Sequence, residues 1–339
     1  RWRDLIVVGE WMPISVYENR KGRLVSITDS VGLSETVGWW KSITSGDFDR
    51  DGDTDYVAGN LGRNTLLKNT EAGPVRIHFG DFNGDGRTDP ILSRYVQGTS
   101  VPVHFRNDLL RQVPSLKEKF SSFERYAQTS MADLLPASAE SKATVYHSDT
   151  FRSSYIENTD DGFAPRPLPL PAQVAPVFGL QSGHYDADGH RDLLLVGNSH
   201  ATEPFTGRYD ALNGALLRGR GDGTFRTIDG TDNGFYVEGD ATALVEMRGA
   251  AGTRLVVTAR NDAPLKAFRV SQDDGRSLLD VSQSVVAAEL HYENGDVERV
   301  EMHSGTGYLS QSGRTLAVPS TVVKATLITR QGERRTWRP

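Results

Sequence analysis

The chain has 339 residues, no cysteine and a formal net charge of −6. Hydrophobic residues make up 37% and charged residues 24%, a balance typical of folded proteins and not of disordered chains. The lack of cysteine excludes disulfides, thiolate metal sites and cysteine nucleophiles. Acidic residues gather in short loops and no basic run occurs, so a nucleic-acid partner is not expected.

No segment approaches the roughly 18 consecutive apolar residues of a membrane span, so we expect no membrane insertion of this chain. The chain opens at Arg1 without a methionine or a signal sequence, as a processed or trimmed chain does. Many of the 34 glycines stand in Asp-Gly, Asn-Gly and Gly-Asp pairs, the chemistry of tight turns between short strands. Composition therefore favours β structure.

A short apolar strand led by a charged residue recurs along the chain. Its copies begin at Asp4, Asp55, Asp89, Asp192 and Arg254. A second strand is predicted after each copy, at 14–19, 65–69, 101–107, 215–219 and 265–270, with a further one at 154–158. This periodicity predicts an all-β fold, a β-propeller of about five to seven blades over residues 1–270 that begins within a repeat, so that an upstream part is expected.

Two segments depart from the repeat. Apolar residues recur every three to four positions between Asp108 and Leu135, which predicts a short insertion of amphipathic helices, with Pro114 starting the second. Residues 271–339 change in character and are expected to form a small C-terminal β domain. Its strongest feature is a hairpin over Val285 to Glu301, because Asn294-Gly295 is a strong turn signal.

Two acidic loops of nine residues precede the second and third copies. Each offers oxygen donors at positions one, three, five and nine, a glycine at position six, and a backbone carbonyl at position seven. The expected ligands are Asp47, Asp49, Asp51, Asp53 and Asp55 in the first loop and Asp81, Asn83, Asp85, Arg87 and Asp89 in the second. Calcium takes six to eight oxygen ligands, and position nine leads into a strand and not an EF-hand helix, so we predict two strand-bounded Ca²⁺ loops. Ordinary turns are the alternative.

A third loop carries Asp186, Asp188, His190 and Asp192, but His184 replaces the first oxygen donor. Imidazole is a poor ligand for calcium, so a third calcium site is left open, and zinc held by His184, His190 and Asp186 is a lesser alternative. At Gly239-Asp240 the fourth loop has lost its acidic series and is expected to fold without metal.

These loops and the strand at 192–198 resemble FG-GAP/VCBS repeats, the calcium-binding blades of integrin-α-like propellers, over most of residues 1–270. Segments 38–49, 108–120 and 151–158 are similar to exported bacterial proteins of the ASPIC/UnbV class, related to cartilage acidic protein. Residues 307–316 are similar to the C-terminal domain of that class. The resemblance implies an extracytoplasmic protein, secreted or at the bacterial cell surface or periplasm, and His184 stands where the family has Asp.

We therefore expect a non-enzymatic binding or adhesion module in which calcium is structural. The expected partner is a glycan, a peptide or a surface protein, with an outer-membrane protein complex as one form. The alternative is a glycan lyase or hydrolase, with His200, Glu203, Arg208 and Tyr209 as the best candidate cluster of acid–base groups. No Gly-x-Ser-x-Gly or His-Glu-x-x-His spacing supports it.

Overall fold

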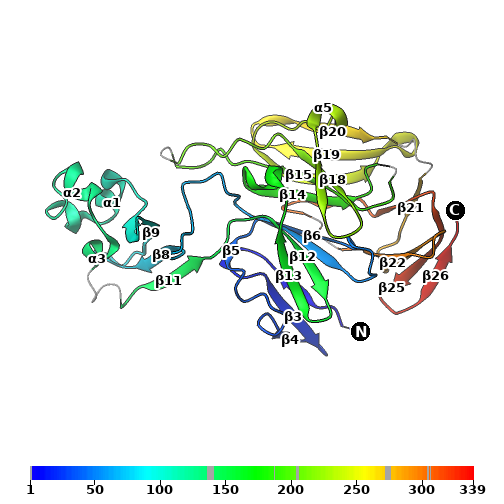
Figure 1. The fold of residues 1–339 in the computed structure, drawn as a ribbon, viewed down its shortest axis with the longest axis horizontal. Coiled ribbons are helices and arrows are strands. Elements are labelled where there is room, and N and C mark those ends of the chain that lie inside the picture. The colour runs from blue at the N-terminus through cyan, green and yellow to red at the C-terminus, as the bar shows by residue number, and fades with distance from the viewer. Residues whose placement is uncertain are drawn as a thin grey trace.

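A computed structural model describes residues 2–135, 141–186, 188–203, 206–271, 276–303, 305 and 307–339. The described chain consists of several small antiparallel sheets with a few short helices, which confirms the predicted all-β class. Figure 1 shows a helix-bearing unit at one end of the molecule and the C-terminal strands at the other. None of the described helices is long and apolar enough to cross a membrane.

Four sheets follow one another along the chain and are numbered sheets 1 to 4. Within each sheet the strands pair antiparallel in chain order. Sheet 1 contains β1 (Leu5–Val7), β3 (Ser15–Arg20) and β4 (Arg23–Ser26), and sheet 2 contains β6 (Ser42–Gly46), β7 (Asp55–Gly59), β12 (Ser154–Thr159) and β13 (Gly162–Pro167). Sheet 3 contains β14 (Val177–Gly183), β15 (Asp192–Gly197), β16 (Ala215–Gly219) and β17 (Phe225–Ile228), and sheet 4 contains β18 (Ala241–Arg248), β19 (Arg254–Arg260) and β20 (Ala263–Val270).

The four sheets stack face to face through separate apolar clusters. Strand β15 shows why, because side chains alternate between the two faces of a strand. Leu193 and Leu195 pack toward sheet 2 with Val57, whereas Leu194 and Val196 pack toward sheet 4. Both faces of β15 are thus buried, and this burial accounts for its uninterrupted apolar sequence.

The charged residue that leads each copy has a structural role. The Oδ1 atom of Asp55 accepts the backbone N–H of Asn158 at 2.9 Å, and Asp192 accepts that of Gly219 at 3.0 Å. Asp4 accepts the N–H of Asn19 at 2.8 Å in the same way. Each carboxylate therefore ties the start of one strand to the end of its neighbour, which makes β1, β7 and β15 equivalent strands of their sheets.

Residues 60–153 leave sheet 2 after β7 and return at β12. They contain a sheet of order β10-β9-β8-β11 that carries the helices, and Figure 1 shows this unit, the insert, extending away from the stacked sheets. Its elements are β8 (Val75–Gly80), β9 (Asp89–Val96), β10 (Thr99–Pro102), α1 (Arg106–Gln112), η1 (Pro114–Lys117), α2 (Phe123–Ala127), α3 (Met131–Leu134) and β11 (Thr144–Ser148). The helices cover Ile91 on one face of the insert sheet.

Two predictions about the repeats are wrong. Residues 65–69 form no strand, and the strand that pairs with β7 in their place is β12. The copy at Asp89 therefore lies within the insert and adds no sheet to the stack. The loop of sheet 4 that corresponds to the acidic loops is residues 249–253, with η3 (Ala250–Gly252), and not Gly239-Asp240. The sequence pattern reports a local loop and strand, whereas pairing depends on which distant segment returns.

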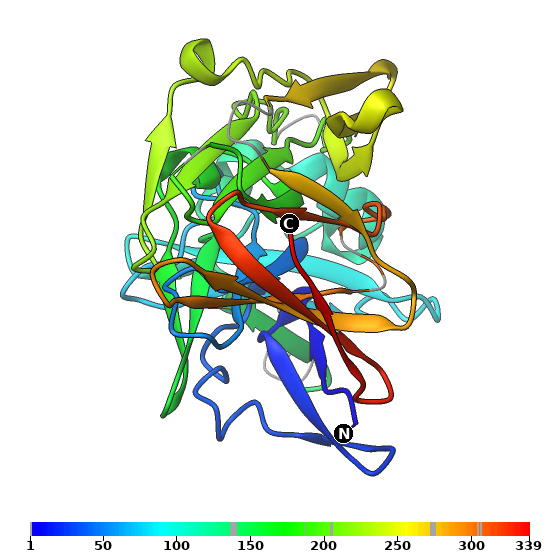
Figure 2. The same ribbon diagram turned by 90° about the vertical axis from the view of Figure 1, so that its right-hand side faces the viewer.

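The C-terminal residues form the predicted hairpin within a larger unit. A sheet of order β23-β22-β25-β26 contains β22 (Val285–Tyr292), β23 (Val297–Glu301), β25 (Val322–Thr329) and β26 (Arg334–Trp337), and β21 (Ser277–Asp280) pairs with β24 (Thr315–Val318). Figure 2 shows these strands, in orange and red, lying between sheet 4 and the N-terminal strands in that view. The remaining elements are β2 (Glu10–Met12), β5 (Gly38–Trp39), η2 (Leu170–Gln173) and α5 (Gly230–Asn233).

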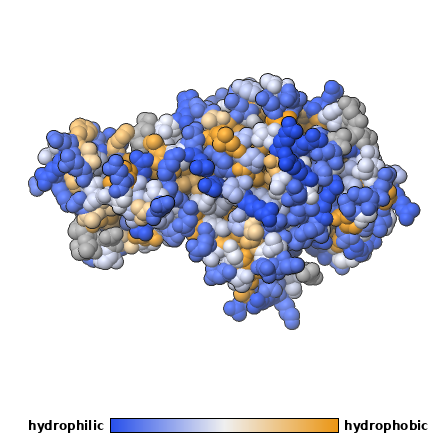
Figure 3. All heavy atoms as spheres, in the orientation of Figure 1, coloured by the Kyte–Doolittle hydropathy of each residue, from blue (hydrophilic) through white to orange (hydrophobic). Residues whose placement is uncertain are grey.

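The face of the molecule drawn in Figure 3 is mostly hydrophilic, with small and separate hydrophobic patches. The adjacent tryptophans Trp39 and Trp40 are packing residues. Trp40 is 3% exposed and donates its Nε1–H to the Thr36 carbonyl at 2.9 Å. Trp39 packs edge-on against Trp11 and Phe151. Both rings therefore serve the packing around sheet 2.

Candidate metal centre

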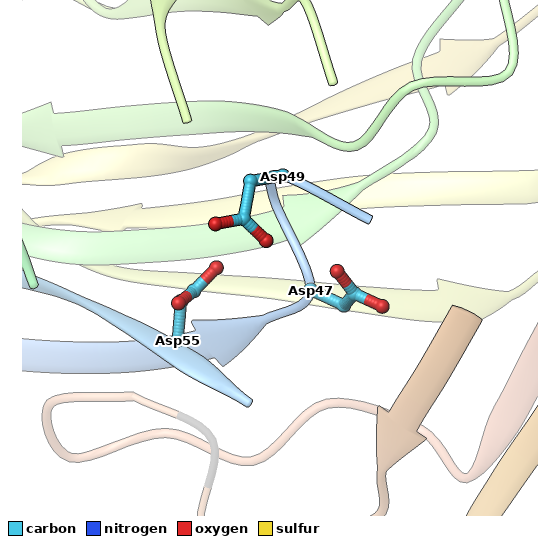
Figure 4. A group of neighbouring side chains, drawn as sticks. All are labelled: Asp47, Asp49 and Asp55. Carbon is cyan, nitrogen blue, oxygen red and sulfur yellow. The ribbon is translucent and has the colours of Figure 1, made fainter. Parts of the chain in front are cut away.

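The loop 47–55 joins β6 to β7 and gathers three carboxylates. One oxygen atom each of Asp47, Asp49 and Asp55 lies within 4.8 Å of the others. Figure 4 shows the three side chains around the point where the loop leaves β6 and enters β7. Gly52 has a φ of +92°, a left-handed conformation that favours glycine and lets the loop fold back on itself.

The loop leaves buried carboxylate oxygens without a donor. Asp47 is 2% exposed, and its Oδ1 atom accepts the Arg50 N–H at 2.8 Å. Its Oδ2 atom and the Oδ1 atom of Asp53 are buried without a hydrogen-bond partner. Burying such a group without a partner is costly, and a hard cation with oxygen ligands would remove the cost. The residues present therefore fit a metal ion.

Burial also opposes the charges of these carboxylates. Burial and the nearby Glu298 charge raise the pKa of Asp47 to about 7. Burial raises the pKa of Asp55 to about 7 as well, although it accepts the Tyr155 hydroxyl at 2.8 Å. Burial, with the charges of Asp51 and Asp49, raises the pKa of Asp53 to about 6. Without a cation the loop holds protons near neutral pH.

The second predicted loop, 81–89, lies in the insert and is arranged differently. Asp81 accepts the backbone N–H groups of Gly84 at 2.7 Å and Gly86 at 2.9 Å. These hydrogen bonds lower the pKa of Asp81, and the bond from Gly86 has the largest effect. Asn83 and Asp85 accept the N–H groups of Asp85 and Arg87, both at 2.8 Å. The loop is a series of such turns, and its carboxylates are not gathered as those of loop 47–55 are. Arg87 is exposed, while Asp89 is buried and accepts the Phe82 N–H at 3.0 Å.

The third loop, 184–192, also gathers three carboxylates, from Asp186, Asp188 and Asp192. An arginine already lies among them. Arg218 from β16 places Nε 2.6 Å from Asp186 Oδ2 and 2.8 Å from Asp188 Oδ2. His190 donates its backbone N–H to Asp188 at 2.8 Å. Sequence reasoning missed Arg218 because it lies 26 residues beyond the loop's last ligand, on another strand.

His184, at the first position of this loop, binds the C-terminal sheet. Its Nε2 lies 3.1 Å from the Glu298 carboxylate of β23, and its Nδ1 lies 2.8 Å from the His190 carbonyl oxygen. Arg191 donates Nε–H to Glu298 at 2.8 Å, and the Tyr292 hydroxyl bonds the same carboxylate. Both ring nitrogens of His184 are engaged, so the zinc alternative with His190 and Asp186 has no support in this geometry.

Glu298 is 4% exposed, and its charge is held by its neighbours. Burial alone would raise its pKa, but the Arg191 guanidinium and His184 outweigh burial and hold the pKa well below its usual range. A second contact lies nearby, since Arg50 of loop 47–55 places Nη1 3.4 Å from Asp296 in the C-terminal hairpin. Loops 47–55 and 184–192 thus form the surface on which the C-terminal sheet docks.

The residues of the candidate acid–base cluster form separate contacts. Tyr209 bonds the Thr65 hydroxyl at 2.9 Å and packs against the apolar cluster between the insert and β5. The His200 N–H donates to Asp240 Oδ2 at 3.3 Å. The side chains of Glu203 and Arg208 are exposed and form no hydrogen bond or ion pair with the described residues. These contacts fit a packed polar loop.

Comparison with known proteins adds one result. Residues 1–58 match the family model of the FG-GAP-like repeat. The matched stretch runs from sheet 1 to β7 and contains loop 47–55, so the match supports the FG-GAP repeat family there. No curated protein matches the chain. The closer relation to the ASPIC/UnbV class stays a prediction.

Glu298→Gln should destabilise the docked C-terminal sheet by about 3–5 kcal/mol, because it leaves Arg191 buried without its counter-charge. Hydrogen exchange of residues 277–337 should accelerate, and urea unfolding should measure the loss. Glu289→Gln is the matched control, since it removes the same charge from the same sheet but only a partly exposed pair with Arg334. Equal effects of the two variants would contradict the docking role of Glu298.

Calcium-free protein should lose stability as the pH rises toward 8. The pKa of Asp47 and Asp55 is about 7 in the folded chain against 3.8 for an ordinary Asp, so the folded state holds extra protons between these values. The stability that these protons contribute is fully present below a pH of 3.8 and is lost as the pH rises through about 7. Calcium should remove most of this slope, and a smaller slope should remain because burial raises the pKa of Asp192 to about 7.

The measurement is Tm from pH 5 to 8, on metal-free protein in metal-free buffer and again with calcium added. Parallel curves with and without calcium would contradict a cation at Asp47 and Asp55.

Proposed function

We propose that this chain is a calcium-stabilised binding module, and that loop 47–55 holds its principal ion. The observation that carries the proposal is the buried Asp47 side chain, whose Oδ2 atom has no hydrogen-bond partner beside Asp49 and Asp55. Oxygen-only donors on a flexible loop suit calcium, because calcium accepts varied geometry, whereas magnesium demands near-ideal octahedral coordination. The ion would supply positive charge that holds the loop together.

The role proposed for the ion is structural. Loop 47–55 supplies its donors from within nine residues, while Tyr155 bonds Asp55 and Arg50 contacts Asp296 of the C-terminal hairpin. An ion that takes its ligands from one loop fits a structural site, whereas a catalytic metal keeps an open coordination position. We therefore propose binding and not catalysis, with a glycan, a peptide or a surface protein complex as the partner.

The finer family relation belongs to the same proposal. Four sheets stack in chain order, and in sheets 2 to 4 the corresponding loop joins the first strand to the second. This arrangement is consistent with propeller blades of the FG-GAP type. The similarity of residues 307–316 to the ASPIC/UnbV C-terminal domain supports membership of that class. An extracytoplasmic location, secreted or at a bacterial surface or periplasm, follows from this family proposal.

Calcium added to chelated protein should raise Tm by several degrees, since calcium at a hundredfold excess over its dissociation constant adds about 2.7 kcal/mol of stability. Magnesium should act more weakly. Asp49→Asn should lower the number of bound calcium ions by one in equilibrium dialysis. Asp222→Asn, at an exposed turn carboxylate of sheet 3, is the matched control and should bind as the unaltered chain does. A Tm indifferent to calcium would refute the metal site.

The binding role is tested separately, by screening the calcium-loaded chain against immobilised glycans and peptides. The expected result is saturable binding of a partner, which is recovered intact. Cleavage of a bound glycan would overturn the non-enzymatic proposal.

A further inference from the structure

Loops 47–55 and 184–192 occupy equivalent places in sheets 2 and 3, which allows them to be compared residue by residue. Tyr56 pairs with Ile156, so the next position along brings Glu157 opposite Asp55. Leu193 pairs with Leu217, so Arg218 stands opposite Asp192. The N–H bonds from Asn158 and Gly219 to these two Asp residues confirm the alignment. The same position therefore carries a carboxylate beside one loop and a guanidinium beside the other.

Arg218 and Glu157 have opposite electrostatic effects on the loops beside them. Arg218 lies between Asp186 and Asp188, at 2.6 Å and 2.8 Å from their Oδ2 atoms, and adds one positive charge to the cluster. Glu157 forms an ion pair with Arg166 on β13, and its charge adds to the causes that raise the pKa of Asp49. No guanidinium or ammonium group is paired with Asp47, Asp49 or Asp55 among the described residues.

The two loops also differ in their buried oxygen atoms, because only loop 47–55 has buried carboxylate oxygens without a partner among the described residues. In loop 47–55 the Asp47 Oδ2 and Asp53 Oδ1 atoms are buried without a partner. In the described part of loop 184–192 no buried carboxylate oxygen lacks one. The first ligand position has also been given another use, because His184 binds Glu298 of the C-terminal sheet at 3.1 Å.

We propose that Arg218 acts as a built-in cation, so that loop 184–192 folds without metal and serves to dock the C-terminal sheet, while loop 47–55 alone of this pair takes the ion. The inference rests on the proposed calcium site in loop 47–55. A guanidinium is always charged and its planar donors match carboxylates, so Arg218 can pair with Asp186 and Asp188 whether or not calcium is present. Sheet 3 and its docking surface then hold their shape when calcium is absent.

The experiment counts calcium ions per chain by equilibrium dialysis, with calcium as the only probe, in single variants of the full chain. Arg218→Gln should gain one ion, and its Tm should become more sensitive to chelation than that of the unaltered chain. Arg226→Gln is the matched control, because Arg226 faces Arg218 across the β16–β17 pair but is exposed and bonds no carboxylate of the described residues. It should gain none.

The reciprocal variant Glu157→Arg should weaken calcium binding at loop 47–55 at least tenfold. A gentler variant guards against misfolding: Asp188→Asn in the otherwise unaltered chain should lose no ion, whereas Asp49→Asn should lose one. Loss of an ion in Asp188→Asn, or no gain in Arg218→Gln at millimolar calcium, would overturn the role of Arg218. An Asp49→Asn variant that binds as many ions as the unaltered chain would instead overturn the proposed calcium site.

Discussion

The fold depends on the hydrogen bonds that a buried carboxylate accepts at the start of the second strand of a sheet. Asp55 is fully buried and accepts N–H groups from Phe48 in the loop and Asn158 at the end of β12, together with the Tyr155 hydroxyl. It therefore joins the loop, its own strand and the neighbouring strand at a single point. Asp192 joins Tyr185 and Gly219 in the same way. Because the carboxylate is enclosed, the negative charge it brings must be balanced locally.

Sheets 2 and 3 differ in how that charge is balanced. Arg218 offsets part of the charge of Asp186 and Asp188 in sheet 3, and Arg191 beside them balances the charge of Glu298. Sheet 2 has Glu157 in the place of Arg218 and two buried oxygens without partners, which leaves a deficit of positive charge. A difference at a single strand position thus separates a loop that can fold by itself from one that suits an ion.

Local features were predictable from sequence, and long-range pairings were not. The loops, strands β7 and β15 and the Asn294-Gly295 hairpin each follow from residues close in the chain. The pairing of β7 with β12 spans the whole insert, so the repeat pattern assigned residues 65–69 in error. Arg218 and Glu298 reach the third loop from distant segments, and no motif marks a residue whose importance comes only from what it faces. A charge of opposite sign at matched strand positions, Glu157 and Arg218, was the one available signal.

The position of Glu298 also links the two loops. Its charge helps to raise the pKa of Asp47, so the docked C-terminal sheet and the ionised Asp47 oppose each other electrostatically. A calcium ion at loop 47–55 would weaken that opposition, since its two positive charges would offset part of the carboxylate charge that Glu298 faces. Linkage requires the effect to run both ways, so a docked sheet favours the cation as much as the cation favours docking. An ion bound in loop 47–55 and the docked C-terminal sheet would therefore stabilise each other.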